Sequence, residues 1–480
     1  MDSSITLPMW LFVLITVFAG VMVVDRFLMP GMRWYFRHRV NRVIDEINTR
    51  LDVEIRPLQI TQRKALIDRL VFDEKVLEAV KQSAQENGLP TSVAQDQARM
   101  FAREIVPAFN AYMYFRIGYW FSKRLARLIY RMRVGFFDNN ELSKIDPESA
   151  VVFVMNHRSN MDYLLVSFLV AEKTALSYAV GEWARIWPLQ TLIRSLGAFF
   201  VRRNSGDRLY RRVLERYVNM ATRAGVCQAV FLEGGLSKDG ALREPKLGFL
   251  DYILRDYHAD TDRDITFIPV GINYDRVLED RTLLRNLDNA ATKRSIWFVL
   301  KTTFRFVLKT LSLSRKTRLR RFGYASVNLG NPISARAYCA KNNVEFIHLE
   351  QEMRFEKVAE LADVLMTEIK DAIPITPVAL MSEIVLFNKG AWRSELELKT
   401  QALTRMEALK KAGAPIRISS STTESVLSGA LDIIEGREWL DVQDSLYKAR
   451  ADAIVILEYY ANSIAHWQPP ESSLHSSPDG

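Results

Sequence analysis

The stretch Ala150–Leu165 reads AVVFVMNHRSNMDYLL, and it is the part of the sequence that best defines the fold. The apolar run Ala150–Met155 predicts a strand buried on both faces, and the second apolar run predicts a helix. His157 and Asp162 lie at the junction between them. An imidazole held by a carboxylate can take a proton from a hydroxyl, so the junction predicts a general base with its orienting acid. Ser159–Asp162 also fits a helix capping box, a structural explanation that is compatible with the first.

The same alternation of apolar runs and helical stretches continues along the chain. Further strands are predicted at 176–180, 198–202, 227–232, 265–271 and 325–329, with helices between them at, for example, 162–172 and 206–224. Strands that alternate with helices indicate an α/β domain built on one sheet.

Helical patterns dominate the regions on either side of these strands. Residues 33–133 are predicted to be helical, including 76–85 and a long stretch at 98–133. Phe101–Arg133 is rich in aromatic and basic residues, which suits a helix at a membrane interface or an ordinary core helix with a basic face. The chain is predicted to be helical again after about residue 340.

The N-terminal segment Leu7–Val24 contains no charged residue and is long enough for a membrane-spanning helix. Basic residues follow it and only Asp2 is charged before it, so the positive-inside rule places the bulk of the chain in the cytoplasm. Aromatic residues at 34–36 suit the membrane interface. A buried helix at the start of a soluble domain is the alternative. We expect residues 1–32 to anchor the chain in the inner (cytoplasmic) membrane, with the active site facing the cytoplasm.

The net charge of +9 favours anionic partners such as lipid surfaces, acidic substrates or nucleic acid. No acidic residue occurs between 289 and 344, and apolar residues recur at helical spacing from Phe304 to Leu311. This pattern predicts a basic amphipathic helix that binds anionic membrane lipids. No nucleic-acid motif accompanies it, so nucleic acid is not expected as a partner. Cys227 and Cys339 lack metal-ligand spacing and are predicted to be reduced and structural.

Three later stretches carry further candidate site residues. GAFFVRR at 197–203 is a strand ending in Arg202 and Arg203, whose planar guanidinium groups suit a phosphate, although such a pair can also be a solvated strand end. FLEGGLSKDG at 231–240 places Glu233 before a glycine turn at which backbone N–H groups can approach a ligand. ITFIPVGINYD at 265–275 contains Pro269, which implies an edge strand or a bulge.

Taken in order, these stretches resemble the four motif blocks of the glycerolipid acyltransferase superfamily. HRSNMD at 157–162 and GAFFVRR at 197–203 are similar to the large membrane-bound glycerol-3-phosphate acyltransferases of bacteria and mitochondria and to their dihydroxyacetone-phosphate relatives. LEYYANSIAH at 457–466 resembles the same branch. The resemblance covers roughly residues 100–466. One departure is Leu236, because that branch usually carries arginine after Glu-Gly-Gly.

The resemblance implies acyl transfer from acyl-CoA or acyl carrier protein to the sn-1 hydroxyl of glycerol 3-phosphate, giving lysophosphatidate in the first step of phospholipid synthesis. His157 would be the general base and Asp162 its orienting partner, with no metal or cofactor. Dihydroxyacetone phosphate or a lysophospholipid is the alternative acceptor, and a catalytically idle membrane scaffold is the alternative class. The implied substrate-binding residues are Arg158, Arg202, Arg203, Glu233, Gly234, Gly235, Ser237, Lys238 and Pro269.

Among these residues, Arg158, Arg202, Arg203 and Lys238 are the candidates for binding the acceptor phosphate. Glu233 and Gly234 would shape the acceptor pocket, and backbone N–H groups of the glycine turn would help to bind the oxyanion. We expect five segments: a membrane-anchoring helix (1–32), a helical N-terminal region (33–140), an α/β acyltransferase domain with a mixed sheet flanked by helices (141–340), a helical C-terminal region (341–467) and a flexible tail (468–480).

Overall fold

The computed structural model describes residues 56–467 apart from 112, 137–144, 171–174, 182–188, 203–204, 286–316, 318–320, 389, 417 and 419–421. The predicted membrane helix, most of the basic amphipathic stretch, Arg203 and the predicted tail therefore lie outside the described residues. None of the helices in the described ranges is long and apolar enough to cross a membrane.

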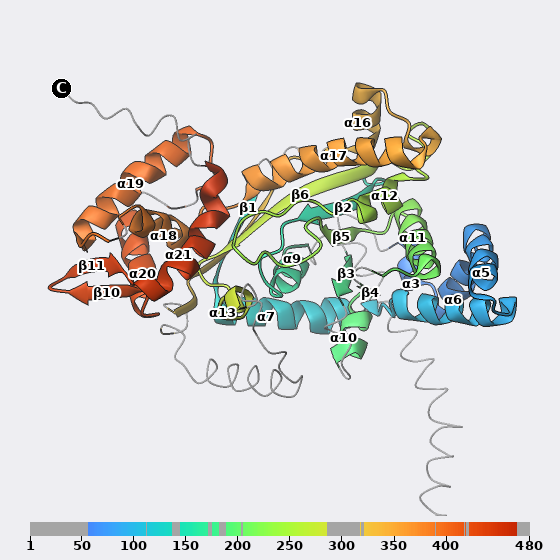
Figure 1. Ribbon diagram of the computed structural model, residues 1–480, viewed down its shortest axis with the longest axis horizontal. Helices are drawn as coiled ribbons and strands as arrows, with labels where there is room; N and C mark the ends of the chain where they lie inside the picture. Colours follow the sequence, from blue (N-terminus) through green and yellow to red (C-terminus); the bar gives the residue numbers. More distant parts are fainter. Residues whose placement is uncertain are drawn as a thin grey trace, which may run out of the picture.

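One mixed sheet forms the centre of the molecule (Figure 1). Its order is β1-β7-β6-β2-β5-β3-β4, with the short β8 also paired to β6. β6 runs parallel to β2 and antiparallel to β7 and β8, and the other pairs are parallel. The predicted α/β class with a mixed sheet is confirmed. The strands are β1 (Arg131–Phe136), β2 (Ala150–Met155), β3 (Ser177–Gly181), β4 (Ala198–Val201), β5 (Gln228–Phe231), β6 (Ile265–Tyr274), β7 (Tyr324–Leu329) and β8 (Ile333–Ser334).

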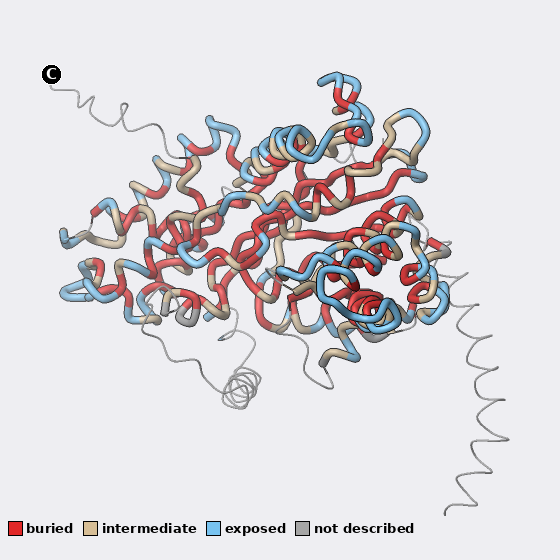
Figure 2. The backbone as a smooth tube through the Cα atoms, turned by 45° about the vertical axis from the view of Figure 1, so that its right-hand side comes forward, coloured by how far each residue is buried: buried red, intermediate tan, exposed pale blue. Residues whose placement is uncertain are grey.

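Strand β2 is buried on both faces, as its apolar run predicted. Val151, Phe153 and Met155 belong to one hydrophobic cluster, while Val152 and Val154 belong to the other. The two clusters lie on opposite sides because successive side chains of a strand point to opposite faces. Figure 2 shows the central strands buried and the outer faces of the helices exposed.

Helices cover both faces of the sheet (Figure 1). The cluster containing Val152 is built with α4 (Arg63–Val71), α5 (Glu74–Asn87), α6 (Thr91–Ile105), α11 (Arg208–Arg223), α12 (Gly248–Leu254), α16 (Ala335–Asn342) and α17 (Gln351–Ala372). The cluster containing Val151 is built with α7 (Tyr119–Ile129), α9 (Asp162–Val170) and the C-terminal region. The shorter helices are α3 (Pro57–Ile60), η2 (Met113–Gly118), α10 (Leu189–Ser195), α13 (Asp280–Arg285) and η4 (Phe346–His348).

The C-terminal region is mainly helical, as expected, but it also contains a small antiparallel sheet of order β10-β11-β9. This region packs against the loops at one end of the central sheet (Figure 1). Its elements are α18 (Pro377–Phe387), β9 (Arg393–Ser394), α19 (Glu395–Lys411), α20 (Thr423–Glu435), β10 (Leu440–Gln443), β11 (Leu446–Ala449), η6 (Ala451–Ala453), α21 (Ile454–Ala461) and η7 (Asn462–Trp467).

The prediction of a helix over 98–133 is wrong in its extent. Helix α6 ends at Ile105, just before Pro107, and the chain then forms the π-helical η2, α7 and finally β1. A proline lacks the N–H that would continue a helix and restricts the residue before it, which explains the first break. Because β1 belongs to the central sheet, that sheet begins before residue 141. The segment limits themselves stay predictions.

Strand β1 lies at the edge of the sheet and pairs with β7. Its two arginines lie over the ring of Tyr324 on β7, with Arg133 at 3.6 Å and Arg131 at 5.7 Å from the ring centroid. Charged side chains on an edge strand discourage pairing with another chain.

The prediction that Pro269 marks an edge or a bulge is wrong, because Pro269 lies inside the internal strand β6. On one side it is in register with Val154 of β2. On the other side β6 changes partner at this point, from β8 at Thr266–Phe267 to β7 from Val270 onward. On that second side Pro269 falls between the β8 and β7 ladders, so its missing N–H interrupts neither of them.

Candidate active site

His157 and Asp162 come together at the carboxyl end of β2, as their spacing predicted. Nδ1 of His157 lies 2.9 Å from Oδ2 of Asp162, and both side chains are buried. An ionised carboxylate can only accept, so Nδ1 carries the proton and donates it to Asp162. Nε2 of His157 then presents its lone pair, and it forms no hydrogen bond with any residue that the structure describes. This is the tautomer that a general base requires.

The Asp162 carboxylate also organises the loop before α9. Its Oδ2 accepts hydrogen bonds from the backbone N–H groups of Arg158 (2.7 Å) and Ser159 (3.0 Å), and its Oδ1 accepts one from the hydroxyl of Tyr274 (2.5 Å). Half of the predicted capping box is present: Asp162 accepts the N–H of Ser159, whereas the hydroxyl of Ser159 accepts the N–H of Met161 rather than that of Asp162.

Aromatic rings enclose the imidazole. His157 stacks on Phe231 of β5 with ring centroids 3.8 Å apart and meets the edge of Tyr163 at 5.7 Å. Only 3 % of His157 is exposed. A nearly dry base is suited to chemistry that must exclude water, such as transfer of an acyl group to an acceptor other than water.

Glu233 holds the histidine loop rather than facing solvent. Its Oε1 accepts the backbone N–H of His157 at 2.8 Å, and its Oε2 accepts that of Arg243 at 3.0 Å. Burial raises the pKa of Glu233 to about 7, although these two hydrogen bonds and the charges of Arg158 and Arg243 favour its ionised form. Glu233 therefore links β5 to the loop that carries His157, and its pKa of about 7 lets it change protonation state near neutral pH.

The glycine turn after Glu233 is closed by its own hydrogen bonds. Ser237 is buried, its hydroxyl donates to Ala241 O (2.7 Å), and its N–H donates to His157 O (3.0 Å). The N–H of Gly234 donates to Phe231 O at 3.0 Å, so neither of these two N–H groups is available to an oxyanion in this conformation. Gly235 is buried, whereas Gly234 and Lys238 are exposed. Lys238 is therefore the residue of this turn best placed to meet a charged substrate.

Arg158 does not lie at an open phosphate site. It is 3 % exposed, donates through Nη1 to Gly240 O, and stacks on the ring of Tyr459 in α21 at 4.7 Å. Its Nε and Nη2 have no partner among the described residues, and they are buried. A small cavity lined by Arg158, Glu233 and Ser463 adjoins them, with room for about one water molecule.

Arg202 follows β4, which lies three strands from β2 in the sheet. All these strands are parallel, so Arg202 shares the carboxyl edge with His157 at a lateral distance of about 14 Å. Its guanidinium binds Glu104 of α6 through Nε (2.9 Å) and Nη2 (2.7 Å). Pro269 lies within β6, in register with Val154 of β2, and not at the carboxyl end of the strand.

Three further site residues were not predicted. The amide of Asn156 exchanges two hydrogen bonds with the backbone of Ile272 (2.8 and 2.9 Å), which extends the pairing of β2 with β6. Glu279 accepts the hydroxyl of Ser159 at 2.7 Å, and burial raises its pKa. Tyr274 contacts Asp162. The available sequence signal was position, since Asn156 and Tyr274 occupy carboxyl ends of predicted strands, where α/β sites gather.

No group of three or more metal-ligating side chains is found in the described ranges. Both cysteines are buried free thiols. The side chains that meet at this point are the His157 imidazole and the Asp162 carboxylate, with the hydrogen bonds described above around them.

Two family models match parts of the chain. Residues 137–273 match the family model described as acyltransferase, and residues 307–476 match that of the glycerol-3-phosphate acyltransferase C-terminal region. The glycerol-3-phosphate acyltransferase of Aeromonas hydrophila is 27% identical over 442 residues, covering 89% of this chain and 53% of the relative. That of Pseudomonas putida strain W619 is 28% identical over 433 residues, covering 85% and 49%.

The chain thus spans about half the length of these curated relatives. A crystal structure of the 1-acyl-sn-glycerophosphate acyltransferase PlsC from Thermotoga maritima matches 53% of this chain and 79% of its own, at 18% identity and a TM-score of 0.30, a likeness too slight to support an argument. The two family matches follow one another in the chain, and the relatives extend across both. Over 85–89% of its length, the chain is therefore similar to glycerol-3-phosphate acyltransferases.

Proposed function

We propose that the protein transfers an acyl group from a thioester, acyl-CoA or acyl carrier protein, to the sn-1 hydroxyl of glycerol 3-phosphate, giving lysophosphatidate. The observation that carries this proposal is the His157–Asp162 pair, with Nδ1 bound at 2.9 Å and Nε2 left to accept a proton. The names of the relatives supply the acceptor.

In the proposed reaction, Nε2 of His157 takes the proton of the acceptor hydroxyl as its oxygen attacks the thioester carbonyl. Asp162 stabilises the imidazolium that forms. The tetrahedral intermediate then collapses, the C–S bond breaks, and the leaving thiolate takes the proton from the imidazolium. The new ester bond replaces the thioester bond, and His157 returns to its starting state.

We propose that Lys238 and Arg202 bind the acceptor phosphate. Lys238 is exposed on the glycine turn that follows β5, and Arg202 lies at the same edge of the sheet. Arg202 would exchange the Glu104 carboxylate for the phosphate, since both present oxygens in the geometry that a guanidinium binds. Arg158 is less suited to this role because it is buried against Gly240 and Tyr459.

The test is an acyl-transfer assay with each acceptor (glycerol 3-phosphate, dihydroxyacetone phosphate and a lysophospholipid) and each donor type. His157→Ala should abolish transfer with folding intact, while His258→Ala, which lies elsewhere on the molecule, should leave it unchanged. Appreciable activity in His157→Ala would remove the base from the mechanism. Absence of transfer in the unaltered protein with every pairing would favour the membrane scaffold.

We also propose that the protein acts at the inner membrane, on anionic lipid, with its site on the cytoplasmic side. Among the described residues, α7 supports this proposal because Trp120 and Phe121 are half exposed beside Lys123 and Arg124. Such a helix suits a lipid interface. Replacing Trp120 and Phe121 by serine should reduce binding to anionic vesicles in a flotation assay. Phe387→Ser, an exposed aromatic in the C-terminal region, is the matched control.

A further inference from the structure

The carboxylate of Asp162 is held from two sides. Oδ2 accepts hydrogen bonds from the backbone N–H groups of Arg158 and Ser159 and from Nδ1 of His157, which all lie in one short loop. Oδ1 receives the hydroxyl of Tyr274 at 2.5 Å, from the far end of β6. A carboxylate anchored only through Oδ2 can rotate about its bond to Cβ. The bond to Oδ1 fixes that rotation, and with it the plane in which the imidazole is held.

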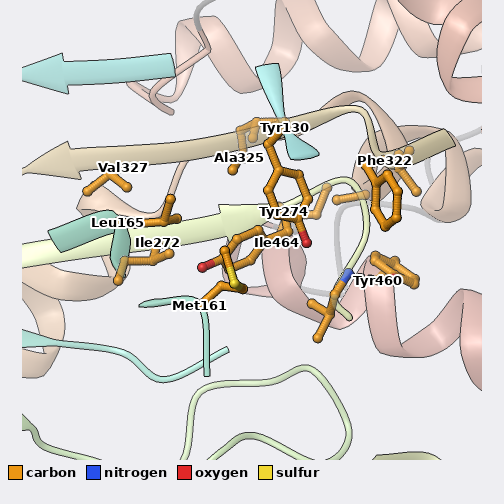
Figure 3. Packing of buried hydrophobic residues seen from close by; sticks show 14 of the residues in the cluster. Tyr130, Met161, Leu165, Ile272, Tyr274, Phe322, Ala325, Val327, Tyr460 and Ile464 are labelled. Atoms are coloured by element: carbon orange, nitrogen blue, oxygen red, sulfur yellow. Dashed lines mark hydrogen bonds between the residues drawn. The ribbon is translucent and has the colours of Figure 1, made fainter. Parts of the chain in front are cut away.

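Tyr274 is itself rigidly placed. Its side chain is fully buried and packs against Tyr130 with ring centroids 5.4 Å apart (Figure 3). Its backbone N–H donates to the side chain of Asn273 (2.9 Å), whose amide in turn donates to Ser463 in η7 (3.0 Å). Burial and the nearby Asp162 charge raise the pKa of Tyr274 well above its ordinary value, so the hydroxyl keeps its proton and stays a donor.

We propose that Tyr274 is a positioning residue of the active site, which orients the Asp162 carboxylate and thereby the His157 base. Tyr274 does not contact the reacting atoms on this proposal and acts only through Asp162. The proposal rests on the acyl-transfer function proposed above, but the geometry it concerns is measurable without substrate. It also connects the C-terminal region to the base, through Ser463, Asn273 and Tyr274 in turn.

The experiment compares Tyr274→Phe with Tyr130→Phe. Tyr130 is an equally buried neighbour in the same packing cluster, but its hydroxyl donates to Arg276 O at 2.7 Å instead of to Asp162 (Figure 3). Each substitution removes one buried hydroxyl and keeps the ring, so both should lower the thermal midpoint by similar amounts. Only Tyr274→Phe should lower kcat, by about ten- to a hundredfold as expected for a misplaced catalytic group, with KM unchanged for both substrates.

A second measurement is independent of turnover. In protein labelled with ¹⁵N-histidine, the Nδ1–H resonance of His157, identified by its loss in His157→Ala, should shift or broaden in Tyr274→Phe and stay unchanged in Tyr130→Phe. An unaltered resonance, or a kcat that falls equally in the two variants, would overturn the positioning role. If the unaltered protein transfers no acyl group while the resonance still responds as expected, the proposed function fails and the positioning role stands.

Discussion

Gly240 is the point at which the glycine turn meets the C-terminal region, and its replacement by alanine tests how much that contact contributes. Gly240 has a φ of +89°, a backbone conformation that costs a residue with a side chain roughly 1–2 kcal/mol. An added Cβ would also overlap the backbone carbonyl of Tyr459 in α21. Overpacking of this kind costs about 1–3 kcal/mol, so the contact should weaken by about 2–5 kcal/mol in total.

Amide hydrogen exchange of α21 and η7 is the appropriate assay, because the substitution should open this local contact before the whole chain unfolds. A loss of 2 kcal/mol or more corresponds to exchange at least about 30-fold faster in residues 454–467. Activity should fall as well, since Gly240 O accepts a hydrogen bond from the guanidinium of Arg158, next to the proposed base His157.

Gly413→Ala is the matched control. Gly413 has a φ of +85° at the end of α19, but an added Cβ there would meet nothing within 4 Å. It should therefore carry the cost of the backbone conformation without the overlap, and it should leave exchange in residues 454–467 unchanged. If Gly240→Ala and Gly413→Ala speed exchange in that segment by the same factor, overlap with Tyr459 is not the cause of the opening.

Three further predictions concern the charged residues Glu233, Arg202 and Asp275, of which the last lies outside the site described above. Because burial raises the pKa of Glu233 to about 7, its carboxylate loses its charge and one of its acceptor oxygens as the pH falls through that value. The kcat should decline below about pH 7, and Glu233→Gln should lower the plateau of the pH–rate profile and remove the part of the decline that Glu233 causes, leaving the part due to protonation of the His157 base. Arg202→Ala should raise the KM for glycerol 3-phosphate with kcat little changed, while Glu104→Gln, which breaks the same ion pair, should not raise it; equal effects would indicate a structural role. Burial raises the pKa of Asp275 to about 6, so between the ordinary pKa of an aspartate and about pH 6 the folded protein holds a proton that the unfolded chain has released. The stability that this group contributes should therefore fall as the pH rises through that range. Asp275→Asn should flatten this slope in thermal unfolding.

The central sheet was predictable because its strands are short apolar runs whose length and burial depend on local sequence. All six predicted strands occur, with ends within a few residues, since continuous hydrophobicity is what a strand covered on both faces requires. Strand β1 was missed because RMRVGF is partly charged and follows a helical pattern without a break. An edge strand needs less apolar surface, so its signal is weaker.

The contact between His157 and Asp162 was predictable for the same local reason, since only five positions in the sequence separate the two residues. The residues that hold this pair in place could not be predicted from the sequence. Tyr274 is 112 positions from Asp162, and Glu233 is 76 from His157, so only the folded sheet brings them together. Arg158 was predicted to meet a phosphate, but the C-terminal helix α21 covers it, a contact that no local pattern encodes.

The pairing of β1 with β7 affects folding during synthesis of the chain. During synthesis β1 leaves the ribosome long before β7, because almost all the other strands of the sheet lie between them in the sequence. During this interval its open backbone groups are available to any other nascent chain. Arg131 and Arg133 give β1 positive charges that repel the same strand of a second copy. In the folded protein these two side chains lie over the ring of Tyr324 in β7. Neutralising both arginines should therefore harm the yield of folded protein during expression more than the stability of the protein once it is folded.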